Sequence, residues 1–258
     1  MLSKRIIKYI QSLSYKKLRS GQHAFIAEGP KVVEEILSTK KFKCKIICAA
    51  ADWLVSNKNL LSGIAAENIY ETNEASLEKI SLLKTPNKVV AVFEINTSDT
   101  PVVSGKLSLM LDDIRDPGNL GTIIRIADWF GVDTIICSHN CVDCYNPKVI
   151  QATMGSIARV NVYYTSLVDF ITSCEPISVY AAALEGEPIK KLGTIKEGII
   201  LIGNESAGIS TELMALASKK ITIPRFGQAE SLNAAVAAGI ILSQVRSQQS
   251  FINKRNDP

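Results

Sequence analysis

Residues 107–125, LSLMLDDIRDPGNLGTIIR, contain an apolar strand, a polar turn and the beginning of a helix. The pattern predicts a strand over Leu107–Asp112 and a helix over Gly121–Phe130. Asp116-Pro117-Gly118 makes the turn between them, because these residue types supply the backbone angles of tight turns. A strand that passes through such a turn into a helix is the repeating unit of an α/β protein.

The same alternation continues to the end of the chain. Further strands are predicted at Thr134–Cys137, Val160–Tyr163, Ser178–Ala182, Ile199–Gly203 and Lys220–Ile223. Helices are predicted at Pro147–Ile157, Leu167–Ser173, Thr211–Ala217 and Leu232–Gln249. The continuous apolar run Ile199-Ile200-Leu201-Ile202 suits a parallel sheet that is covered on both faces. In such sheets, ligands bind beyond the carboxyl ends of the strands.

The first part of the chain alternates shorter elements and predicts a smaller α/β domain. We expect this domain at residues 1–100, a linker at 101–106 and the parallel-sheet domain at 107–258. Its helices are predicted at Lys4–Leu18, Pro30–Leu37, Trp53–Leu61 and Ser76–Leu83. Its strands are predicted at Ala24–Ala27, Ile46–Ala50, Asn68–Tyr70 and Val89–Ile95.

Composition places the 258 residues among ordinary globular proteins, since 47% are hydrophobic and 21% charged. The longest apolar run, Ala234–Leu242, is about half of what a membrane helix needs. The N-terminus has no apolar signal core, so the cytoplasm is the expected location. Cys137, Cys141 and Cys144 include one C-x-x-C pair without a second pair nearby, so no metal site is predicted.

The net charge of +4 is unevenly distributed. The first 27 residues contain no Asp or Glu and six Lys or Arg residues: Lys4, Arg5, Lys8, Lys16, Lys17 and Arg19. Such a stretch can neutralise nucleic-acid phosphates, or it can be a solvated helix face, and charge alone does not decide between them.

Several common enzyme classes are disfavoured. The loop Gly203–Gly208 is followed by Ile209 and not by the lysine of a phosphate-binding loop, and no G-x-G-x-x-G follows a strand. With only His23 and His139, a histidine-based hydrolase is also disfavoured.

Three loops at strand ends together resemble one known family. The motifs are Asp116-Pro117-x-Asn119-x-Gly121-Thr122-x-x-Arg125, Ile202-Gly203-Asn204-Glu205-x-x-Gly208 and Ile223-Pro224-x-x-Gly227-x-x-x-Ser231-Leu232-Asn233. They resemble the three signature motifs of the SpoU (TrmH-type) RNA ribose 2'-O-methyltransferases of the SPOUT superfamily, over residues 107–249. The segment Tyr145–Gly155 is also similar to this family. Phe25–Glu35 resembles the substrate-binding domain that often precedes it, which is related to small ribosomal RNA-binding proteins.

The resemblance implies properties that periodicity could not indicate. It implies a parallel sheet with a deep trefoil knot, a feature too rare to infer from pattern alone. It also implies S-adenosylmethionine as cofactor, RNA as substrate and a homodimer whose sites lie beside the subunit interface. Ribosomal RNA is favoured because of the preceding domain.

The motif positions give the candidate site residues. By resemblance, the cofactor lies against Leu201, Ile202, Gly203, Ile223, Ser231 and Leu232. The catalytic candidates are Arg125, Asn119, Glu205, Ser231 and Asn233. We expect Arg125 to anchor a phosphate beside the target ribose, because a guanidinium is a poor base and its fork matches phosphate oxygens. Candidate RNA contacts are Lys16, Lys17, Arg19 and Lys31.

Other interpretations stay open at this point. A transfer-RNA 2'-O-methyltransferase, a non-catalytic RNA-binding or ribosome-assembly factor, and an enzyme that protects ribosomal RNA from an antibiotic would share the fold. The chain also departs from the common pattern. Gln151 stands where many relatives have a basic residue. Arg225-Phe226 stands where an apolar residue such as methionine is frequent.

Overall fold

The computed structural model describes residues 2–96, 100–174, 176–192 and 195–253. The chain forms two compact units. The first unit comprises Met1–Thr97 together with Asp143–Arg159, and the second unit comprises Ser98–Val142 together with Val160–Pro258. The chain passes from one to the other near the predicted linker at 101–106, and the stretch 143–159 groups with the first unit. The domain limits 1–100 and 107–258 stay a prediction.

The first unit has a four-stranded mixed sheet in the order β1-β4-β2-β3. Its strands are β1 (Ala24–Glu28), β2 (Cys44–Ala49), β3 (Ile69–Glu71) and β4 (Val89–Glu94). Strand β4 is antiparallel to both neighbours, and β2 and β3 are parallel. The helices are α1 (Lys4–Ser12), α2 (Lys16–Gln22), α3 (Pro30–Thr39), α4 (Ala51–Ser56) and α5 (Glu74–Ile80), with a short 3-10 turn at Ala66–Asn68.

The single helix predicted over Lys4–Leu18 is in fact two helices, α1 and α2. A turn separates them, and its carbonyl oxygens at Leu13 and Ser14 accept hydrogen bonds of 2.9 and 2.8 Å from the Arg19 guanidinium. Leu13 itself is buried in the core of the unit. The break therefore accompanies the burial of Arg19 and Leu13, which helical periodicity does not reveal.

Residues 143–159 belong to the first unit through specific contacts. Tyr145 packs on Phe25 with ring centroids 4.9 Å apart. Helix α7 (Pro147–Thr153) follows and stops four residues short of its predicted end. Gly155 has φ +95°, and a Cβ there would overlap the side chain of Glu35 on α3. Only glycine permits both this backbone conformation and this close approach. The turn Ser156–Ala158 then completes the segment.

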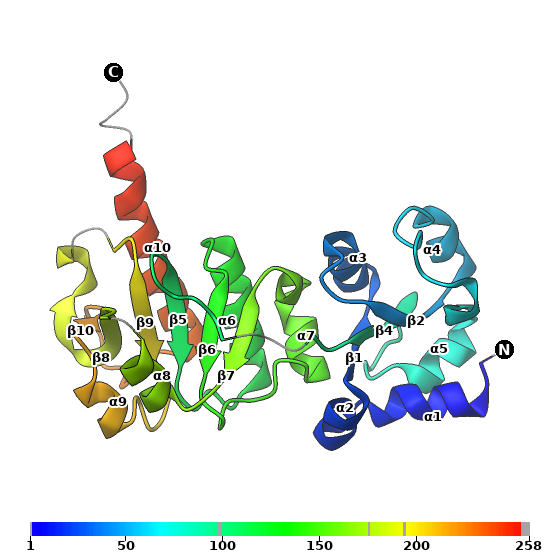
Figure 1. Cartoon of the computed structure of the whole chain (residues 1–258), viewed down its shortest axis with the longest axis horizontal. Coiled ribbons are helices and arrows are strands. Elements are labelled where there is room, and N and C mark those ends of the chain that lie inside the picture. Colours follow the sequence, from blue (N-terminus) through cyan, green and yellow to red (C-terminus); the bar gives the residue numbers. More distant parts are fainter. Residues whose placement is uncertain (1, 97–99, 175, 193–194, 254–258) are drawn as a thin grey trace. The chain divides into compact units, whose positions relative to one another are not determined.

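The second unit has a six-stranded sheet in the order β10-β8-β9-β5-β6-β7, as Figure 1 shows. Every neighbouring pair of these strands is parallel, which confirms the predicted parallel sheet. The strands are β5 (Leu107–Leu111), β6 (Thr134–Cys137), β7 (Asn161–Tyr164), β8 (Val179–Pro188), β9 (Gly198–Ile202) and β10 (Lys219–Thr222). Leu111 pairs with Ile202, so β5 and β9 end at the same level.

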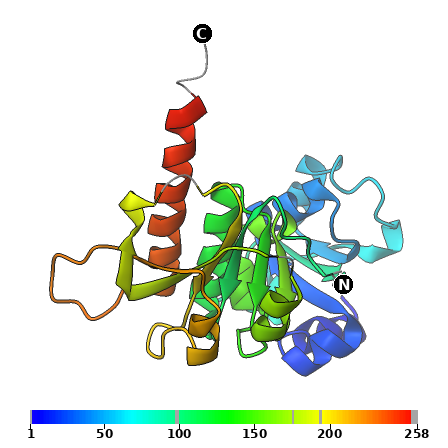
Figure 2. The same cartoon turned by 60° about the vertical axis from the view of Figure 1, so that its left-hand side comes forward.

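Helices cover this sheet. Helices α6 (Pro117–Trp129) and α10 (Ala234–Asn253) pack against each other. Helices α8 (Leu167–Ser173) and α9 (Thr211–Ala215) contribute to a core cluster with the strands. A 3-10 turn, Ile189–Lys191, contacts α10. Figure 2 shows the loop after β10 extending away from the sheet before the chain enters α10.

Helix α6 begins one turn earlier than predicted. Asp116 is its N-cap, and the Asp116 carboxylate accepts a hydrogen bond of 2.8 Å from the backbone N–H of Asn119. Pro117 occupies the first turn, where its missing N–H costs nothing. Asn119 therefore lies in the first turn of a capped helix. Each helix in the described part of the chain is too short or too polar to span a bilayer.

Candidate functional site

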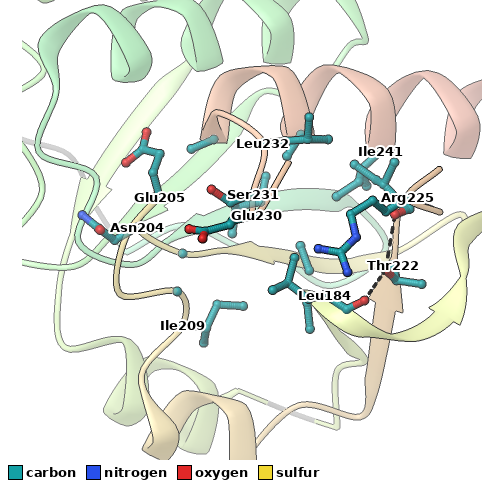
Figure 3. A pocket seen from close by; sticks show the side chains of 18 of the residues that line it. Leu184, Asn204, Glu205, Ile209, Thr222, Arg225, Glu230, Ser231, Leu232 and Ile241 are labelled. Atoms are coloured by element: carbon teal, nitrogen blue, oxygen red, sulfur yellow. Dashed lines mark hydrogen bonds between the residues drawn. The ribbon is translucent and has the colours of Figure 1, made fainter. Parts of the chain in front are cut away.

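A hollow of about 1010 Å³ lies at the carboxyl ends of β9 and β10 and against the middle of β8 (Figure 3). Its volume is at the upper end of the roughly 300–1,000 Å³ typical of small-molecule sites. Two loops form much of its rim: residues 203–210 after β9 and residues 223–233 after β10. The apolar part of its lining includes Ile202, Ile209, Met214, Ile221, Ile223, Leu232 and Ile241.

The loop after β9 is held by its own hydrogen bonds. Asn204 and Gly208 exchange two backbone hydrogen bonds of 3.1 and 2.9 Å. The Asn204 side chain accepts from the N–H groups of Ser206 and Ala207 and donates to the carbonyl oxygen of Asp113 at 2.9 Å. A Cβ at Gly203 would overlap the backbone of Gly208. The glycine is therefore required by the tight return of the loop on itself.

The loop after β10 is more open. Residues 225–233 are all exposed, including Leu232 at 45%. Thr222 fixes the start of the loop, because its hydroxyl donates a hydrogen bond of 2.9 Å to the carbonyl oxygen of Leu184. Within the loop, the guanidinium of Arg225 donates to the carbonyl oxygen of Ala229 at 3.3 Å. This loop therefore forms an exposed wall of the hollow.

A chain of hydrogen bonds joins all three sequence motifs beside the hollow. The Asn233 side-chain amide donates to the side-chain oxygen of Asn119 at 2.8 Å. The amide nitrogen of Asn119 in turn donates to the carboxylate of Glu205. Glu205 lines the hollow, and Figure 3 shows it next to Asn204 at one end.

Helix α10 sets the direction of this chain. The side-chain oxygen of Asn233 accepts from the backbone N–H groups of Ala235 and Val236 at 3.0 and 3.3 Å. Since backbone N–H groups only donate, the amide nitrogen of Asn233 must point the other way, toward Asn119. Asn119 must then present its own N–H₂ group to Glu205. The start of one helix thereby holds a carboxylate in a fixed orientation at the hollow.

The structure brings most of the candidate cofactor residues together. Ile202, Gly203, Ile223, Ser231 and Leu232 all line the hollow. Leu201 does not line it, since its side chain is buried in the core cluster of the sheet. Strand side chains alternate between the two faces, so the neighbour of a lining residue points elsewhere.

Arg125 is not among the residues that line the hollow. Helix α6 buries the stripe that contains Leu120, Ile123, Ile124 and Ala127. Arg125 lies on the exposed side of the helix, one turn before Trp129, which is 84% exposed. Within a single chain, the Arg125 guanidinium therefore belongs to the surface of α6 and not to the wall of the hollow.

The candidate RNA contacts divide into two groups. Lys16, Lys17 and Lys31 are exposed on the first unit. Arg19 is only 2% exposed and forms an ion pair of 2.6 Å with Asp143. Together with its bonds to two carbonyl oxygens, this pair uses the guanidinium inside the unit. Arg19 is therefore a structural residue, contrary to the prediction that it contacts phosphate.

The cysteines at the end of β6 support the first motif loop. The Cys141 thiol accepts from the N–H of Ile114 at 3.2 Å and donates to the carbonyl oxygen of Leu111 at 3.3 Å. A hydrogen bond from Cys137 is the largest of the influences that lower the pKa of Cys141 to about 7. Among the residues that the structure describes, no group of three or more metal-ligating side chains comes together.

Two charged residues of the hollow were not among the sequence candidates. Arg225 and Glu230 both line it, and both come from the loop after β10. The one sequence signal for Arg225 was its departure from the family pattern, in which an apolar residue is frequent at this position. Glu230 directly precedes the Ser231-Leu232-Asn233 motif, but nothing in its type or spacing distinguishes it from a solvated loop residue.

Comparison with known proteins gives consistent matches over both units. Residues 106–243 match the SpoU rRNA Methylase family, and residues 4–91 match the MRM3-like substrate binding domain. The chain is 30% identical over 243 residues to the 23S rRNA (guanosine(2553)-2'-O)-methyltransferase RlmP of Bacillus subtilis, covering 93% of this chain and 95% of the relative.

Solved structures resemble the chain over almost its whole length. A TrmH-family RNA methyltransferase described as putative, from Porphyromonas gingivalis, is 36% identical with a TM-score of 0.87, covering 96% of this chain and 99% of that one. The AdoMet-bound rRNA methyltransferase from Sinorhizobium meliloti is 32% identical with a TM-score of 0.84, covering 96% of each chain.

Proposed function

The chain belongs to the SpoU rRNA methylase family, and from this we infer that its hollow is the S-adenosylmethionine site of an RNA ribose 2'-O-methyltransferase. The substrate we assign is ribosomal RNA. The observation that carries this proposal is the hydrogen-bonded chain Asn233–Asn119–Glu205, which joins all three motifs at the edge of the hollow.

The residues of the hollow fit this cofactor. Apolar side chains such as Ile223 and Leu232 suit the faces of an adenine ring, and the main chain of the two loops offers hydrogen-bonding groups for its edge. The lining also contains the carboxylates of Glu205 and Glu230 and the guanidinium of Arg225. These groups suit a ligand that carries charges of both signs. When bound, S-adenosylmethionine supplies a methyl group attached to a sulfonium. The protein's share is to bind and orient the reactants.

Glu205 supplies the carboxylate that we place beside the acceptor ribose. One of its oxygens accepts the Asn119 amide, and the other stays available to accept a hydrogen bond from the ribose 2'-hydroxyl. Asn119 and Asn233 fix the direction of the carboxylate. Ser231 lines the same wall and offers a hydroxyl to the sugar or to the cofactor.

Arg125 anchors RNA from the surface of α6. A guanidinium holds a phosphate through two parallel hydrogen bonds, and its exposed position suits a polymer that approaches from outside. Lys16, Lys17 and Lys31 of the first unit add phosphate contacts, because each is an exposed cation. The first unit thereby selects the RNA, chiefly by its shape and backbone.

The active form is a homodimer with a knotted second unit. Support for a dimer comes from α6, where Trp129 is exposed one turn from Arg125, because tryptophan is enriched at protein interfaces. A dimer that covers this face places Arg125 beside the subunit interface. Support for a deep trefoil knot is the match of residues 106–243 to the SpoU rRNA Methylase family.

The test is methyl transfer with identification of the product. Protein is incubated with S-adenosylmethionine and with unmodified 23S ribosomal RNA, 16S ribosomal RNA or transfer RNA, and the digested RNA is analysed for methylated nucleosides by mass spectrometry. We expect one 2'-O-methylnucleoside in ribosomal RNA, and none with Glu205→Ala. Product only in transfer RNA would contradict the substrate, and base-methylated product would contradict the reaction.

A binding measurement separates an enzyme from a non-catalytic assembly factor. Calorimetry should detect saturable S-adenosylmethionine binding to the full chain. A chain that binds ribosomal RNA but not S-adenosylmethionine would be an assembly factor, and the proposed enzymatic function would be wrong.

A further inference from the structure

Charged side chains are few in the lining of the hollow. Among the described residues that line it, only Glu205, Arg225 and Glu230 carry charge, and Arg225 is the one cation. The hollow therefore presents two negative groups and one positive group to whatever it binds.

Arg225 is placed to bind a ligand. It follows β10 by three residues, and Figure 3 shows its guanidinium extending from the loop toward the middle of the hollow. One nitrogen donates to the carbonyl oxygen of Ala229 at 3.3 Å, which ties the side chain to its own loop. In the part of the chain that the structure describes, Arg225 makes no ion pair. A guanidinium has five N–H donors, so most of them remain for a ligand.

The charges of S-adenosylmethionine complement those of the hollow. The cofactor carries a sulfonium, an α-ammonium and a single α-carboxylate. The ligand thus brings two cations and one anion to a hollow whose lining contains two anions and one cation. We propose that Arg225 binds the α-carboxylate of S-adenosylmethionine. This inference rests on the proposed function of the hollow and names the group that orients the methionine part of the cofactor.

The chemistry of arginine suits this role. A guanidinium and a carboxylate form two parallel hydrogen bonds, which fix direction as well as distance. The bond from Arg225 to Ala229 limits the freedom of the side chain before the ligand arrives, so less is lost on binding. A phosphate of RNA is another anion that a guanidinium can bind. The position of Arg225 in the lining, among the residues that would hold the cofactor, favours the carboxylate.

Calorimetry with a matched pair of ligands tests the assignment. The ligands are S-adenosylmethionine and decarboxylated S-adenosylmethionine, which differ only in the carboxylate. The proteins are the full-length chain, Arg225→Leu, Arg225→Lys and Gln228→Ala. Gln228 lies in the same loop but does not line the hollow. Thermal melting verifies that each variant is folded.

We expect Arg225→Leu to weaken S-adenosylmethionine binding by roughly 10- to 100-fold, the factor that corresponds to losing a charge-assisted hydrogen-bonded pair. Binding of the decarboxylated ligand should change little. Arg225→Lys should keep part of the preference for the carboxylate, and Gln228→Ala should bind both ligands as the unaltered chain does.

Other outcomes would overturn the inference in recognisable ways. Equal weakening of both ligands by Arg225→Leu would mean a structural role in the loop. Unchanged cofactor binding with a raised KM for RNA would mean a phosphate contact. Neither result would affect the proposed function. Failure of the unaltered chain to bind either ligand would reject the proposed function and this inference together.

Discussion

Asn233 has two tasks that different atoms of one side chain perform. Its oxygen caps helix α10, and its nitrogen orients Asn119. The two tasks can be separated by substitution, because aspartate keeps an oxygen for the cap but has no nitrogen to donate.

Asn233→Asp should therefore leave the melting temperature close to that of the unaltered chain while lowering kcat/KM roughly tenfold or more, as expected when an oriented hydrogen bond is lost beside the reacting groups. Asn233→Ala should lower kcat/KM similarly and also cost about 1 kcal/mol of stability through the lost cap. Thermal melts and steady-state methyl transfer measure the two effects. Full activity in Asn233→Asp would show that the chain to Glu205 is not needed.

Glu28 makes the stability of the first unit depend on pH. It is 4% exposed, and its carboxylate accepts 2.7 Å hydrogen bonds from the Leu82 N–H and the Ser81 hydroxyl. Burial raises the pKa of Glu28 above its ordinary value of 4.5, and the two hydrogen bonds oppose this only partly. The folded chain thus holds the proton more tightly than the unfolded chain. The resulting stabilisation is fully present below pH 4.5 and is lost as pH rises through the folded-state pKa.

Glu28→Gln removes this titration. The stability of the unaltered chain relative to Glu28→Gln should be greatest at acid pH and should decline as the pH rises toward neutrality. Urea unfolding of both proteins across that range measures the difference. A constant difference at every pH would mean that the pKa of Glu28 is the same in the folded and unfolded chain.

At the scale of elements, local patterns predicted the second unit well. Strands such as β6 and β9 lie where alternation and apolar runs placed them, and the motif loops follow them as expected. The errors occur where distant residues decide. Helix α7 ends early because Gly155 must pass Glu35, more than a hundred residues away in sequence.

The sequence did not show that the side chains of Arg19 and Leu201 are buried, because their burial depends on packing. Arg19 belongs to a basic stretch, but its partner Asp143 lies in the second half of the sequence. Leu201 lies beside the lining residue Ile202, but its side chain faces the core. The motifs identified which loops form the site. They could not tell which side chains of those loops reach the hollow, because that depends on how the strands and loops pack.

The ion pair between Arg19 and Asp143 should hold residues 143–159 on the first unit. Asp143→Asn removes the carboxylate charge and leaves the buried guanidinium with neutral acceptors, among them the carbonyl oxygens of Leu13 and Ser14, so we expect a loss of about 3 kcal/mol, the low end for breaking a buried pair. Hydrogen exchange should increase in residues 143–159 first.

Asp52→Asn is the matched control, because Asp52 and Lys88 form an ion pair in which both side chains are 61% exposed. Asp52→Asn should change neither the free energy of unfolding nor hydrogen exchange measurably. If Asp143→Asn behaved in the same way as this control, the pair would not stabilise the segment.

At the scale of the whole molecule, sequence predicted an α/β protein with a parallel-sheet unit preceded by a smaller one, and the structure has both sheets. The grouping of residues 143–159 with the first unit was not predicted, because its evidence is contact between segments far apart in sequence. Oligomeric state is a property of the same scale. The exposed Trp129 on α6 is the side chain on which the proposed dimer depends most.

Trp129→Glu should therefore convert a dimer to a monomer, because a charge would have to be buried at the interface. Size-exclusion chromatography with light scattering should give twice the chain mass for the unaltered protein and the single chain mass for the variant. Thr122→Glu, about two turns earlier on the same exposed side of α6, would show how far the interface extends. A monomeric unaltered protein, or a dimeric Trp129→Glu variant, would contradict the proposed dimer.

We propose that loops following separate strands of one sheet combine to bind S-adenosylmethionine. Titration of this ligand into the full chain tests it most directly, with Leu232→Trp to fill the hollow and Gln228→Trp to add the same bulk to the loop outside it. We expect one bound ligand per chain in the unaltered protein and in Gln228→Trp, and at least roughly tenfold weaker binding in a folded Leu232→Trp. Absence of binding in the unaltered chain, or undiminished binding in Leu232→Trp, would contradict the account.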